Sequence, residues 1–84
     1  MLDEREVRAG LQKLLNERLT TRQLATKEGF DDNDTLNSLE LDSLDKVELW
    51  MATEDYFKIK LEENDVMKLT TVGELVYLVL SKSS

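Results

Sequence analysis

The chain has 84 residues with no cysteine and no histidine, and its 18 acidic and 11 basic side chains give a formal net charge of −7. This length suits a single domain, residues 1–84, and leaves little room for both an apolar core and an enclosed active site. Because the thiolate ligand, the imidazole ligand and the commonest general base are all missing, we expect neither an enzyme nor a metal site.

Apolar residues in the first half predict one long helix followed by a long loop. A helix is expected over residues 3–19, with one inner stripe formed by Val7, Leu11, Leu14, Leu15 and Leu19. The run Thr20-Thr21-Arg22-Gln23 fits a capping box and predicts a short helical turn that stops at Gly29. Residues 20–41 are otherwise predicted to form a connection, which the apolar side chains of Leu36, Leu39 and Leu41 pin to the core.

The second half predicts three more helices. Asp42 is a good N-cap for a helix from Ser43 to about Phe57. Residues 58–61 are expected to be extended, and a short helix fits residues 62–68. Thr71-Val72-Gly73-Glu74 is a capping box for a last helix through Leu80, with a fraying tail at 81–84; its inner face comprises Val72, Leu75, Val76 and Val79. The predicted fold class is all-α: a small four-helix bundle, three longer helices plus one short helix, with a long first loop.

The helix that begins at Ser43 carries two apolar stripes. One is formed by Leu49, Trp50, Thr53, Tyr56 and Phe57. A helix at the surface of a small bundle needs only one such stripe, so the second is a candidate docking face for a partner protein. The alternative is that part of it covers the neighbouring loop. We define the docking face as Leu44, Val47, Glu48, Met51, Glu54 and Asp55.

Acidic residues are concentrated in the middle of the chain. Residues 31–65 contain twelve acidic and three basic side chains, a net charge of −9. Such a surface repels nucleic acid and attracts basic protein surfaces, or it serves only to solvate the protein. No stretch is apolar enough to cross a bilayer, and the first five residues lack the apolar region of a signal peptide. We therefore expect a cytoplasmic monomer that does not insert into membranes.

Residues 39–49, with the sequence Leu-Glu-Leu-Asp-Ser-Leu-Asp-Lys-Val-Glu-Leu, carry a specific resemblance. They resemble the phosphopantetheine attachment motif of acyl carrier proteins, in particular the Asp-Ser-Leu core of the fatty-acid type. The similarity continues from residue 36 to the last helix and is weaker in the first. The resemblance implies that residues 1–84 form one acyl-carrier domain.

By this resemblance, Ser43 takes a 4′-phosphopantetheine arm through a phosphodiester, and the arm's thiol holds acyl groups as thioesters. The first turn of a helix is electrostatically suited to a phosphate ester. Asp42 and Leu44 would help a phosphopantetheinyl transferase recognise the serine. The docking face would meet basic surfaces of acyl-transferring and synthase enzymes in fatty-acid, polyketide or specialised pathways.

The sequence departs from this family pattern just before the motif, in the longer Asp-rich loop ahead of it, and in the interior. Glu40-Leu41 replaces the usual Gly-Ala before the motif, which makes the loop bulkier and favours a specialised pathway over bulk fatty-acid synthesis. In similar carriers the acyl chain can fold back between the second and third helices. Trp50 and Val66 stand where smaller residues are usual, and Thr53 stands where Leu is common. These residues predict a small pocket suited to short or polar cargo, or cargo left in solvent.

Three other interpretations compete with a carrier. Ser43-Leu44-Asp45-Lys46 matches the Ser-x-x-Lys motif of much larger acyl-transferring enzymes. Residues 31–34 begin like a calcium loop, but Leu36 replaces the required glycine and Asp42 the final glutamate, which leaves at most a weak divalent-ion site. A cofactor-free acidic helical interaction module explains charge and periodicity as well as a carrier does. Only Ser43 within its motif distinguishes a carrier from such an interaction module.

Overall fold

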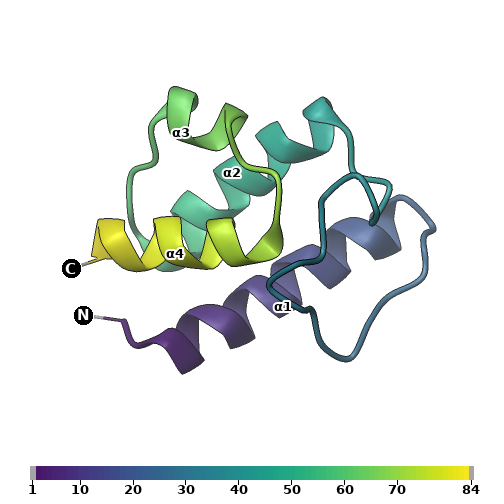
Figure 1. Cartoon of the computed structure of the whole chain (residues 1–84), viewed down its shortest axis with the longest axis horizontal. Helices are drawn as coiled ribbons and strands as arrows, with labels where there is room; N and C mark the ends of the chain where they lie inside the picture. The colour runs from purple at the N-terminus through teal and green to yellow at the C-terminus, as the bar shows by residue number, and fades with distance from the viewer. Residues whose placement is uncertain (1, 84) are drawn as a thin grey trace.

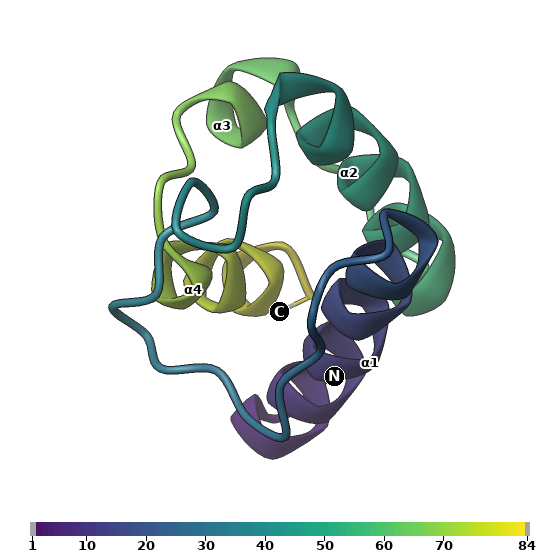
Figure 2. The same ribbon diagram turned by 90° about the vertical axis from the view of Figure 1, so that its right-hand side faces the viewer.

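The computed structural model describes residues 2–83 and contains four helices in that range. These are α1 (Glu4–Thr21), α2 (Ser43–Phe57), α3 (Glu63–Met67) and α4 (Val72–Ser83). The longest helix, α1, packs against both α2 and α4, and the short α3 packs on α2 (Figures 1 and 2). The predicted all-α class, with three longer helices, one short helix and a long first loop, is confirmed.

One apolar core joins the helices. Every residue assigned to the inner stripes of α1 and α4 is buried, and so are Leu36 and Leu41 from the first loop. Leu39 is half-buried against the same core. The inner stripe of α2 is narrower than predicted, because Trp50 is half-buried and Tyr56 is exposed. Its buried members Leu49, Thr53 and Phe57 lie four residues apart on one line along the helix.

The capping box predicted at Thr20 is wrong, and so is the helical turn after it. Thr20 and Thr21 are the last two residues of α1. Gln23 takes a left-handed conformation with φ 60°, and the backbone amide of Leu24 donates to the Leu19 oxygen at 2.8 Å. This is the Schellman motif of a helix C-terminus, which stops α1 without a glycine. Residues 22–42 contain no helix.

The long connection from α1 to α2 is tied down along its length. Arg8 pairs with Asp32, and Lys27 pairs with Asp34 at 2.8 Å. The backbone amides of Val72 and Gly73 donate to loop carbonyls at 2.9 and 3.0 Å, where the connection passes the start of α4 (Figure 2). Asp32 and Asp34 are thus engaged with basic side chains. Within residues 2–83 no cluster of three or more carboxylates is arranged to hold a metal ion.

The ends of α4 show one success and one error of prediction. The Thr71–Glu74 capping box forms as expected: each residue's amide donates to the other's side chain, at 2.9 and 3.2 Å. The helix does not stop at Leu80 but continues to Ser83. The hydroxyl of Ser83 donates to the Leu80 carbonyl at 3.1 Å, which satisfies a backbone group at the helix end. The predicted fraying is therefore wrong for residues 81–83, and Ser84 lies outside the described residues.

Candidate functional site

Ser43 is the first residue of α2, and its side chain is exposed to solvent. Its hydroxyl makes no hydrogen bond to residues 2–83. The helix is capped instead by Asp42, whose carboxylate accepts from the Asp45 amide at 3.1 Å, as predicted. The Asp45 carboxylate accepts in return from the Asp42 amide, also at 3.1 Å. The capping box therefore closes without the Ser43 side chain.

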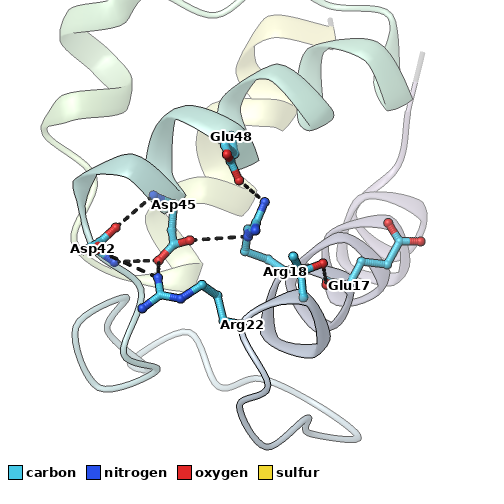
Figure 3. Close-up of polar contacts among 7 residues, drawn as sticks. Glu17, Arg18, Arg22, Asp42, Asp45 and Glu48 are labelled. Carbon is cyan, nitrogen blue, oxygen red and sulfur yellow. Dashed lines mark hydrogen bonds and ion pairs between the residues drawn. The ribbon is translucent and has the colours of Figure 1, made fainter.

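Two arginines at the end of α1 anchor this capping box from below (Figure 3). Asp45 is only 3 % exposed. The Arg18 Nε atom lies 3.3 Å from one of its oxygens, and Arg22 bonds to the other. Arg18 also bonds to Glu48. The paired charges hold the start of α2 against the end of α1, which fixes the position of Ser43.

Sequence analysis missed this anchor. The spacing Asp42-x-x-Asp45 is the same signal that located the capping box at Thr71, and it could have been found in the same way. Arg18 in the last turn of α1 and Arg22 at its C-cap stand four residues apart, which is the spacing of side chains that share a helix face. Their pairing with Asp45 joins residues more than 20 positions apart, and no local pattern specifies such a contact.

The electrostatics of the site keep Asp42 ionised. The hydrogen bond from the Asp45 backbone amide lowers the pKa of the Asp42 carboxyl below its ordinary value of 3.8, and the nearby Arg22 lowers it further. Among the described residues, no basic group hydrogen-bonds to the Ser43 hydroxyl to activate it as a nucleophile. In the Ser-x-x-Lys run, the Lys46 ammonium donates to the Leu69 backbone oxygen at 2.8 Å. The lysine of this run is therefore bonded to the backbone, and the Ser43 side chain is exposed to solvent.

The six residues of the docking face divide into exposed and engaged side chains. Leu44 is 67 % exposed and Met51 is 63 % exposed, and Asp55 is exposed as well. The other three are half-buried. Of these, Glu48 pairs with Arg18, and a Glu54 oxygen accepts from the Leu61 amide at 2.8 Å. Two carboxylates of this face therefore also hold the fold together.

Comparisons with known proteins place this site in a family. A family model described as the phosphopantetheine attachment site matches residues 9–79, which include Ser43. An acyl carrier protein of Cyanidium caldarium is 32 % identical over 82 residues, spanning 98 % of this chain and 92 % of that protein. The chain belongs to the acyl carrier protein family. A second relative, from a Picosynechococcus strain, is 44 % identical over 48 residues, which is 57 % of this chain and 59 % of that protein.

A solved structure supports the same assignment. The crystal structure of an acyl carrier protein from Thermotoga maritima superposes with a TM-score of 0.73 and 28 % identity, covering 90 % of this chain and 89 % of that one. Members of the family are carriers that use phosphopantetheine and work with synthase and transferase enzymes; they are not catalysts. The match therefore favours a carrier over the cofactor-free interaction module. Among residues 2–83, no helix combines the length and apolarity needed to cross a membrane.

Proposed function

We propose that this carrier holds acyl intermediates as thioesters on a 4′-phosphopantetheine arm attached to Ser43. The observation that supports the proposal most is the position of Ser43. Its hydroxyl is exposed and makes no hydrogen bond within the described part of the chain, and the residue begins a helix whose cap is complete without it. The amides at this end of a helix favour an anionic group. The residues present therefore fit a phosphodiester.

The partner enzymes that we propose would contact two surfaces of the carrier. Asp42 and Leu44 flank the serine and are exposed, so a phosphopantetheinyl transferase can contact both. The acyl-transferring and synthase enzymes would use the docking face, where basic side chains meet Asp55 and the apolar side chains of Leu44 and Met51 are buried. The pathways served are those of fatty-acid, polyketide or specialised acyl transfer. We place the carrier in the cytoplasm as a monomer.

Transfer of the arm in vitro tests the attachment site. The protein is incubated with coenzyme A and a phosphopantetheinyl transferase, and its intact mass is measured. We expect a gain of one phosphopantetheine in the parent and no gain in Ser43→Ala. Because the Ser43 side chain is exposed and makes no hydrogen bond within residues 2–83, the variant should keep its free energy of unfolding within about 0.5 kcal/mol. Modification of Ser38 or Ser81 in place of Ser43 would refute the assignment.

A further inference from the structure

Lys46 lies on the same side of α2 as Ser43, one helical turn further along. Residues three apart in a helix are neighbours on its surface, so the Lys46 side chain begins beside the serine. Asp45 is two positions from Ser43 and points to another side, toward α1 and its arginines (Figure 3). Helical geometry thus places Lys46, rather than the α1 arginines, next to a group attached at Ser43.

The ammonium of Lys46 is fixed against the connection between α3 and α4. It donates to the backbone oxygen of Leu69 at 2.8 Å. The amide of the same peptide group, that of Thr70, donates to the Glu74 carboxylate at 2.9 Å. This one peptide group therefore accepts a hydrogen bond from a lysine of α2 at its oxygen and donates one to a carboxylate of α4 from its nitrogen. This arrangement holds the lysine in a defined place, with its side chain half-buried.

Lys46 retains unused hydrogen-bonding capacity. An ammonium group has three donors, and Leu69 uses one of them. Within residues 2–83, no carboxylate lies at ion-pair distance from Lys46. Arg18 and Arg22, by contrast, are engaged with Asp45 and Glu48. Glu74 is close enough that the charge of Lys46 helps to lower the pKa of the Glu74 carboxyl, but the two form no ion pair. Of these three cations around the start of α2, Lys46 is therefore the one that can bind an anion without breaking an ion pair.

We infer that Lys46 binds the phosphodiester at Ser43 and so directs the arm along the α3 side of the carrier. This inference rests on the function proposed above. The phosphodiester adds one negative charge at a position one helical turn from Lys46 along α2, where the lysine side chain can form a charge-assisted N–H···O bond with the donors that Leu69 does not use. The arm then leaves the protein beside α3, away from the end of α1. Lys46 is a positioning residue for the arm and takes no part in acyl chemistry.

A spin label on the arm tests this direction. The chain contains no cysteine, so the thiol of the arm is the single thiol in the loaded protein and accepts a nitroxide selectively. Paramagnetic broadening of backbone amides is then compared between α3 and residues 18–21 of α1. We expect stronger broadening at α3 in the parent. In Lys46→Met it should fall about two- to fivefold, the range for loss of one exposed ion pair.

Matched variants separate a contact from a change of net charge. Lys60 is exposed and lies between α2 and α3, so Lys60→Met removes the same charge and should leave the broadening unchanged. Lys46→Arg keeps the charge and should keep the parent pattern. In the parent, added salt should weaken broadening at α3. Equal patterns in the parent and Lys46→Met, or equal losses in both methionine variants, would overturn the inference. Absence of any arm by intact mass would instead refute the proposed function.

Discussion

Asp42 and Asp45 each accept a hydrogen bond from the other's backbone amide, both at 3.1 Å, and this exchange begins α2 immediately around Ser43. The two carboxylates have different surroundings. Asp42 is exposed to solvent, whereas Asp45 is buried and pairs with Arg18 of α1 and with Arg22 at the C-cap of that helix. One aspartate therefore completes the cap at the surface, and the other ties that cap to the neighbouring helix.

Asp45→Asn should destabilise the protein, although it leaves Ser43 itself unchanged. Losing one partner of a fully buried ion pair costs roughly 3–5 kcal/mol. Arg18 and Arg22 keep some contact with water, and asparagine still accepts one hydrogen bond, so we expect a loss of about 2–3 kcal/mol. Urea denaturation measures this value. Asp55→Asn on the exposed side of α2 is the control and should change it by less than about 0.5 kcal/mol.

Stability should fall in acid through a small set of carboxylates. Hydrogen bonds lower the pKa of Asp32, Asp34, Asp42 and Glu74 below their ordinary values of 3.8 and 4.5. Groups of this kind contribute stability that is fully present above the unfolded-state pKa and is lost as pH falls through the folded-state pKa. The free energy of unfolding should therefore be level near neutral pH and decline below about pH 4.5.

The contributions of Asp32 and Asp42 to this loss of stability in acid can be separated by varying the salt concentration and by the variant Asp42→Asn. The pKa of Asp32 is lowered mainly by Arg8, and an exposed ion pair is screened by salt. The pKa of Asp42 is lowered mainly by a backbone amide, which salt screens less. Thermal unfolding at several pH values should thus show a shallower decline in Asp42→Asn at high and low salt alike. An unchanged slope in that variant would contradict the role of the cap.

Glu40→Gly should stabilise the carrier. Glu40 has φ 65°, a left-handed conformation that costs a residue with a Cβ atom roughly 1–2 kcal/mol. Glycine removes that cost but loses more backbone entropy on folding, so we expect a net gain of about 0.5–1 kcal/mol by urea denaturation. Glu40→Ala keeps the Cβ atom and should gain nothing. A gain of the same size in alanine would show that the charge, and not the backbone, was responsible.

The left-handed conformation of Glu40 also illustrates what could not be predicted from the sequence. Helical periodicity identified the buried faces of α1 and α4 residue by residue, because burial repeats with the helix. The ends of helices were harder. Gln23, Glu40 and Lys58 all adopt left-handed conformations that sequence signals assign to glycine. Each is followed by a residue whose amide bonds back five positions: Leu24, Leu41 and Ile59. Those apolar residues are buried or half-buried, so tertiary packing holds these turns against local preference.

The site was predicted unevenly for the same reason. Ser43 and its cap Asp42 lie in one short motif, and the sequence located both. The contacts of Lys46 with Leu69 and of Arg22 with Asp45 each join residues 23 positions apart. They depend on how the helices pack, which no local pattern contains. The charge of the docking face was predictable, but the pairing of Glu48 with Arg18 was not.

Asp55→Lys is the cleaner probe of docking, because Asp55 is exposed and Glu48 is paired. Reversing one rim charge should slow association with a basic partner, and the difference from the parent should shrink at high salt. Transfer of the arm at limiting carrier concentration measures the rate for the phosphopantetheinyl transferase. Leu44→Ala, next to the serine, should reduce the rate at every salt concentration. Equal rates for parent and Asp55→Lys at low salt would exclude Asp55 from the face that this transferase reads.

Packing between α2 and α3 should limit how long an acyl chain the carrier can enclose. Trp50 is half-buried against the core, and Val66 of α3 is buried. Thr53 is fully buried, with its hydroxyl bonded to the Leu49 oxygen at 2.6 Å, so the space there is occupied and its polar atom is satisfied. The bond from Lys46 to Leu69 joins α2 to the residue just beyond the C-cap of α3. Close-packed interiors do not absorb added bulk without rearrangement.

A series of acyl chains of increasing length on the arm tests this limit. Each buried methylene contributes up to about 0.8 kcal/mol, so thermal stability should rise over the first few carbons and then level off. Trp50 is the single tryptophan, and its emission reports on the same region. Trp50→Val should extend the rise to longer chains, because it removes the largest side chain in this region of α2. A steady rise out to long chains in the parent, with a shift in Trp50 emission, would show that α2 and α3 separate to admit the cargo.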